Sequence, residues 1–221
     1  MTGRDWIRVG CALLALAGAA AGHEDGVAAR VNGTAITDAM VNDVVKGVIA
    51  GRPKPPSSEE IAQLSNEALE SLIDLELLYQ AALAQKLTVS DLEINAEIAR
   101  SRQRFADEAA YKAALKKSGL SPEQLRAETR KTLLVNKFLA DVVWKGAQVA
   151  PGAPQRFYEE HRAEMTAAAP SGTTPSFKSM EGWIHQTLLQ QARDERQRAY
   201  VAELKRTAKI EIPDARPTPP R

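Results

Sequence analysis

Apolar and polar residues alternate with helical spacing over most of this chain. The most apolar stretch covers residues 67–83, where leucine and isoleucine recur on more than one side of the predicted helix. A helix that is apolar on several faces is usually surrounded by neighbours. We therefore expect a central helix that opens near Ser58 and reaches at least Leu83.

Helix start signals and apolar stripes predict further helices on both sides of this central one. Thr37 and Ser121 have the short oxygen-bearing side chains that cap a first turn, and Ser90 with Glu93 forms a capping box. Gln124, three residues after Ser121, completes a similar pattern. The predicted helices cover residues 38–49, 92–104, 107–117, 122–144, 155–165 and 177–207.

Strand patterns occur near the two ends. Residues 27–37 alternate around an Asn32-Gly33 turn, and residues 209–212 alternate as Lys-Ile-Glu-Ile. A lone strand would leave its backbone hydrogen-bonding groups unpaired, so we expect the two segments to pair. The predicted fold is mainly α, with a small two-stranded sheet formed by the N- and C-terminal strands and closed by a long C-terminal helix.

The chain begins with a pattern typical of a secretory signal. Residues 1–21 have basic Arg4 and Arg8, an apolar run over 9–17 and small alanines at the end. An uncleaved membrane-anchoring helix is the alternative. We expect cleavage, a periplasmic location and no stable membrane insertion afterwards. The sequence predicts one helical domain over 22–212, a linker at 165–176 and a disordered tail at 213–221.

Composition and charge argue against several function classes. The formal net charge is +1 and no basic stripe is visible, so nucleic acid is not an expected partner. Cys11 is the one cysteine and lies in the predicted signal, which excludes a disulfide in the mature chain. No nucleotide-binding motif occurs and His23, His161 and His185 lack metal-ligand spacing, so we expect no cofactor and solvated histidines.

Two carboxylates within the central helix are the candidates for an acid pair. Asp74 and Glu76 are two residues apart, so they project from different sides of a helix and cannot converge on one substrate. We expect both to form structural salt bridges at the edge of the core.

Short motifs occur here in an order that resembles the SurA/PrsA group of exported chaperones in the parvulin-type peptidyl-prolyl isomerase family. A V-N-G strand motif is followed by I-T, and a leucine-rich helix is followed by an L-x-V-S-D-x-E junction. An F-Y-E-E segment, a glutamine-rich helix and a K-I-E-I strand complete the order. These motifs lie at Val31–Gly33, Ile36–Thr37, Leu72–Ala82, Leu87–Glu93, Phe157–Glu160, Leu188–Gln191 and Lys209–Ile212.

The resemblance implies a helical SurA N-terminal-like chaperone domain. Members of that group carry a parvulin isomerase domain at the position between Glu164 and Phe177, where this chain has only a short linker. We therefore expect an ATP-independent holdase for unfolded or nascent exported proteins, and no enzyme. The alternatives are a dedicated accessory factor in envelope protein or polysaccharide export, a catalytic isomerase, and a dimerisation module whose long terminal helix swaps between the protomers of a homodimer.

Large apolar residues near the vacant junction are the candidate client contacts. They are Trp144, Phe157, Tyr158, Met180 and Trp183. Packing of the last helix against the body is the alternative role, because large apolar side chains are usually buried. Their solvent exposure separates the two interpretations.

Overall fold

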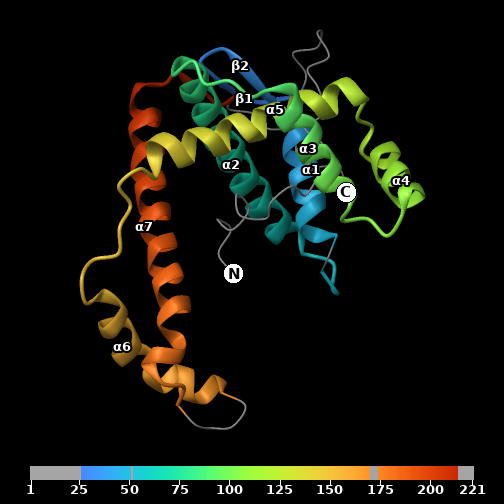
Figure 1. Ribbon diagram of the computed structural model, residues 1–221. Coiled ribbons are helices and arrows are strands. Elements are labelled where there is room, and N and C mark those ends of the chain that lie inside the picture. The colour runs from blue at the N-terminus through green and yellow to red at the C-terminus, as the bar shows by residue number, and fades with distance from the viewer. Residues whose placement is uncertain (1–25, 51, 170–173, 214–221) are drawn as a thin grey trace. The chain divides into compact units, whose positions relative to one another are not determined.

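The computed structural model describes residues 26–50, 52–169 and 174–213, which fall into two compact units (Figure 1). The first unit runs to Phe138 and also takes in the chain from Leu204 onward, and the second spans Leu139–Glu203. The assignment of 22–212 to one folding domain stays a prediction. The predicted signal, and the tail beyond Pro213, lie outside the described residues.

A three-stranded antiparallel sheet joins the two ends of the described chain. Strand β1 (Val27–Val31) pairs with β2 (Thr34–Thr37) on one side and with β3 (Ile210–Glu211) on the other. The predicted pairing of the terminal strands is confirmed, and the sheet has one strand more than expected. The extra strand forms because Asn32 (φ 51°) and Gly33 (φ 90°) both adopt the left-handed backbone that a tight hairpin turn requires.

Five helices of the first unit follow the sheet along the chain, and their capping signals match the sequence closely. Ser90 and Glu93 form the predicted capping box, and α2 begins at Ser58, as expected, with Ser57 as its N-cap. Ser57 is the better cap because Glu60, three residues on, can bond back to its N–H. The helices are α1 (Asp38–Ile49), α2 (Ser58–Ala84), α3 (Asp91–Arg102), α4 (Glu108–Ser118) and α5 (Pro122–Phe138).

Helix α2 is central to the first unit, as predicted. It contacts α1, α5, β1 and β2 (Figure 1). Its most apolar residues are buried. Leu204, Ala208 and Ile210, from the C-terminal end, pack against the same core. The buried cluster includes Ala28, Ala29, Val31, Ile36, Val41, Val44, Val45, Ala68, Leu69, Leu72, Ile73 and Leu77.

The two carboxylates in the middle of α2 bind different lysines. Asp74 lies 2.6 Å from the Lys205 ammonium, which Glu70 also contacts at 2.7 Å. Burial lowers the pKa of Lys205, but the hydrogen bonds that its ammonium donates to Asp74 and Glu70 outweigh this effect and leave the pKa above the ordinary 10.5. Glu76 is buried and pairs with Lys131 of α5 at 2.6 Å. Both carboxylates are therefore in structural ion pairs, as the sequence predicted.

The second unit contains a π-helical turn and two helices. The helix predicted to reach Trp144 changes hydrogen-bonding register at Leu139–Val143, where the Trp144 N–H donates to the Leu139 carbonyl at 2.7 Å. Helix α6 (Ala153–Ala168) extends three residues past the predicted Met165, so that part of the expected 165–176 linker is helical. Alanine has the highest helix propensity, which accounts for the extension through Ala167 and Ala168.

Helix α7 (Phe177–Thr207) belongs to the second unit up to Glu203. Among the described residues, no helix combines the length and apolar character needed to cross a membrane.

Candidate functional site

Aromatic side chains of α6 and α7 meet in the second unit and stay partly open to solvent. The ring centres of Phe157 and Trp183 lie 6.2 Å apart with an interplanar angle of 60°, an edge-to-face arrangement. Trp183 is 54% exposed and Phe157 is half-buried. An indole this exposed is available to bury apolar surface of another molecule.

His161 extends this aromatic pair along α6. Its ring stacks on Phe157 with the ring centres 4.1 Å apart, and Nδ1 lies 2.9 Å from the Phe157 carbonyl. The carbonyl can only accept, so Nδ1 carries the proton in this bond. His161 is half-buried where the sequence analysis expected a solvated side chain. In the sequence, the spacing of four residues between Phe157 and His161 indicates that their side chains lie together on one side of a helix.

Met180 completes what we call the α6–α7 surface, defined by Phe157, His161, Met180 and Trp183. It precedes Trp183 by three residues, so both lie on one side of α7, and it is half-buried. Thioether and aromatic side chains together suit binding of varied apolar groups.

Tyr158, a fourth sequence candidate, is placed in the interior. It is 7% exposed, its hydroxyl donates to the Pro175 carbonyl at 2.8 Å, and its ring meets Phe177 edge-on at 5.7 Å. These contacts fix α6 to the start of α7. Tyr158 therefore supports the surface from below and is not open to a client.

Trp144 is held by α7 in a different environment. The Arg193 guanidinium lies 5.5 Å from its ring centre, and the neighbouring Val143 carbonyl accepts a 2.9 Å hydrogen bond from Arg196. Trp144 is half-buried, and its indole nitrogen has no hydrogen-bond partner among the described residues. The structure thus brings Phe157 and Trp183 into ring contact and gives Trp144 partners elsewhere on α7.

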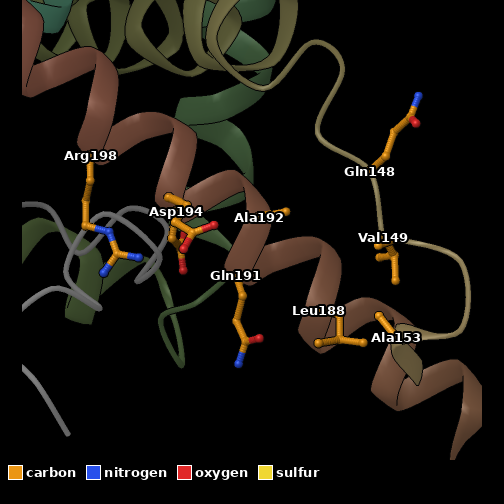
Figure 2. Close-up of a pocket in the computed structure, with 10 residues that line it drawn as sticks. Gln148, Val149, Ala153, Leu188, Gln191, Ala192, Asp194 and Arg198 are labelled. Atoms are coloured by element: carbon orange, nitrogen blue, oxygen red, sulfur yellow. The ribbon is translucent and has the colours of Figure 1, made fainter. Parts of the chain in front are cut away.

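A pocket of about 520 Å³ lies in the same unit, between the segment that precedes α6 and the middle of α7 (Figure 2). Sequence analysis did not anticipate it, because it depends on how a loop packs against a helix. Its charged groups are two carboxylates and one guanidinium, so it carries little net charge. The lining residues are Gln148, Val149, Ala150, Ala153, Leu188, Gln191, Ala192, Asp194, Glu195 and Arg198.

The lining is suited to binding and offers no nucleophile of the serine, cysteine or lysine type. Within the part of the chain that the structure describes, no cluster of three or more histidine, cysteine, aspartate or glutamate residues could hold a metal ion.

Comparison with known proteins places the chain in a family through its first part. The SurA-like N-terminal domain family matches residues 6–139, more than half of the chain. Chaperone SurA of Chromobacterium violaceum is 31% identical over 118 residues, which cover 51% of this chain and 27% of that protein. The chain thus spans about a quarter of the length of this curated relative.

A solved structure shares the fold. It comes from a study describing the virulence factor PEB4 and the periplasmic protein Cj1289 as two structurally related SurA-like chaperones in Campylobacter jejuni. The TM-score is 0.56 at 15% identity, covering 86% of this chain and 100% of the other. The mainly helical SurA-like fold expected from the motifs is confirmed, and the family supports a chaperone role. The chain belongs to the family of proteins with a SurA-like N-terminal domain.

Proposed function

We propose that this protein is an ATP-independent holdase that binds unfolded exported polypeptides on the α6–α7 surface. Family membership supports the chaperone role, and the exposure of Trp183, 54% of its surface, is the observation that carries the site. A bound apolar side chain would bury the indole and Phe157 from water. Each 100 Å² of apolar surface removed from water contributes roughly 2.5 kcal/mol before ordering costs, which suits weak, reversible binding.

The proposal includes no isomerase activity. Helix α6 ends at Ala168 and α7 begins at Phe177, so only residues 169–176 separate them. A folded domain of the usual size needs roughly 100 residues. The connection is therefore too short for an isomerase domain at the position where the resemblance would put it.

We also propose that the protein acts in the periplasm. The predicted signal over residues 1–21 supports export, and one of the two SurA-like chaperones named for the similar structure, Cj1289, is described as periplasmic. N-terminal sequencing of the protein from a periplasmic fraction tests this, and a product that still begins at Met1 contradicts cleavage.

Light scattering from two unrelated denatured enzymes tests the holdase proposal. The protein should suppress aggregation of both at near-stoichiometric ratios without nucleotide, and should leave a proline-limited refolding reaction at its uncatalysed rate. Suppression of neither enzyme, with tight binding to one folded partner, would identify a dedicated accessory factor instead.

A further inference from the structure

The segment leading into α6 has unused backbone hydrogen-bonding groups beside the pocket. Within the described residues, no hydrogen bond reaches the N–H of Gln148, Val149 or Ala150, and the segment has no helical or strand structure. Gln148 and Ala150 are exposed and Val149 is half-buried. Unpaired backbone groups of this kind usually bond to water or to a partner.

Two glycines set the ends of this segment. Gly146 (φ 81°) and Gly152 (φ 74°) both adopt the left-handed backbone that glycine tolerates without strain. They turn the chain into and out of the segment, and Gly152 starts α6 directly afterwards. The position of the segment is thus fixed at both ends by backbone geometry.

The other wall of the pocket leaves room for a chain. Ala192 on α7 contributes little side-chain bulk, while Leu188 adds an apolar patch and Gln191 an amide (Figure 2). Ala150 and Ala153, which also line the pocket, are equally small. The volume of about 520 Å³ falls within the roughly 300–1,000 Å³ of typical ligand pockets. Two carboxylates and one guanidinium leave a small net negative charge, which does not favour a phosphate or another strongly anionic ligand.

The pocket adjoins the α6–α7 surface along both helices. Leu188 follows Trp183 by five residues on α7, about 7.5 Å of helix rise and about 140° around the helix. Phe157 follows Ala153 by about one turn of α6. Because residues four apart share one side of a helix, an extended peptide that meets Phe157 can continue past Ala153 into the pocket.

We infer that the pocket is a backbone-recognition subsite, in which an extended client segment pairs its main chain with residues 148–150. This inference rests on the proposed holdase function and adds how clients of unrelated sequence are held. Pairing along an extended segment supplies affinity through main-chain hydrogen bonds that any sequence can make. Leu188 and the alanines then accept small or apolar side chains without strong selection.

Peptide binding measured by fluorescence anisotropy tests the subsite. The probe is a short fluorescein-labelled peptide rich in valine and threonine, and the variant is Ala192→Trp, which fills the pocket. Ala202→Trp is the matched control, because Ala202 is exposed on the same helix and does not line the pocket. We expect about tenfold weaker binding for Ala192→Trp alone, the equivalent of losing roughly 1.4 kcal/mol, at unchanged melting temperatures.

A second peptide separates backbone from side-chain recognition. It has the same side chains but N-methyl groups on alternate amides, and it should bind the wild-type protein about as weakly as the parent peptide binds Ala192→Trp. Equal affinity of both peptides, or of both variants, overturns the subsite. Aggregation suppression by the wild-type protein is measured in parallel, so that loss of the subsite with suppression intact leaves the holdase proposal standing. If the wild-type protein neither suppresses aggregation nor binds the peptide, both proposals fall.

Discussion

Asn32 holds Lys209 through two hydrogen bonds: its backbone N–H donates to the Lys209 carbonyl, and its side-chain oxygen accepts from the Lys209 N–H, each at 2.8 Å. The side-chain nitrogen of Asn32 donates to the side-chain oxygen of Gln80 on α2 at 2.7 Å. One turn residue thus links the last strand to the central helix across 177 positions of sequence. The fold of the first unit depends on this late contact.

Truncation after Ala208 should therefore destabilise the first unit. The deletion removes β3 and its pairing with β1 and Asn32, and about three hydrogen bonds at ~1 kcal/mol each predict a loss near 3 kcal/mol. Urea unfolding followed by circular dichroism measures the change. A chain that ends at Pro213 and keeps β3 is the control, and it should match the full-length protein. Equal stability of the two truncations would show that β3 contributes nothing.

Replacing the lysine that pairs with Glu76 should lower the free energy of unfolding more than replacing both members of the pair. The Glu76 side chain is 7% exposed and that of Lys131 is 18% exposed. Lys131→Met therefore leaves the buried Glu76 carboxylate without its cationic partner. We expect a loss of about 3–5 kcal/mol for this change. The double variant Glu76→Leu/Lys131→Met should recover most of that loss in the same unfolding measurement. A near-neutral single variant would contradict the burial of this pair.

Glu128 of α5 should limit stability at neutral pH. Burial raises the pKa of Glu128 above 4.5, and the nearby Glu76 adds to the rise while Lys131 opposes it. Because the folded state favours the protonated form, stability falls as pH rises through the raised pKa. Glu128→Gln should stabilise the protein at pH 7, and the difference from wild type should vanish below about pH 4.5. A constant difference at every pH would contradict this cause.

Local signals predicted the helices of both units, including α7 with its full bounds, but not which side chains of the second unit face solvent. Neighbours in sequence are enough to specify the capping box at Ser90, the turn at Asn32-Gly33 and the leucine pattern of α2. The family motifs indicated the order of these elements along the chain. The third strand follows from the same turn but was overlooked.

The site could be predicted only as a list of residue types. Phe157 and Tyr158 are adjacent and similar, yet Phe157 is half-buried at the surface while Tyr158 is buried and bonds to Pro175. The two differ because a helix turns neighbouring side chains about 100° apart. Which of the two faces inward depends on where α7 lies, a long-range contact absent from local patterns. The pocket also depends on long-range packing, and lining residues such as Ala192 and Ala150 have no functional group that would mark a site in the sequence.

The family match stops at the boundary between the two units. It ends at residue 139, at the first residue of the second unit, so the α6–α7 surface and the pocket lie beyond it. The matched part places the chain in its family and supports a chaperone role. The client-binding features proposed for this protein lie in the unmatched part.

Affinity for a permanently unfolded protein, compared between wild type and Trp183→Ala, tests the central claim most directly. Leu92→Ala is the control, because Leu92 is 79% exposed but lies on α3 in the first unit. A reduced and alkylated, fluorescein-labelled protein serves as the client in an anisotropy titration. We predict that Trp183→Ala weakens binding roughly tenfold, about 1.4 kcal/mol, at an unchanged melting temperature, and that Leu92→Ala binds like wild type. Wild-type affinity in Trp183→Ala would contradict the α6–α7 surface as the client-binding site.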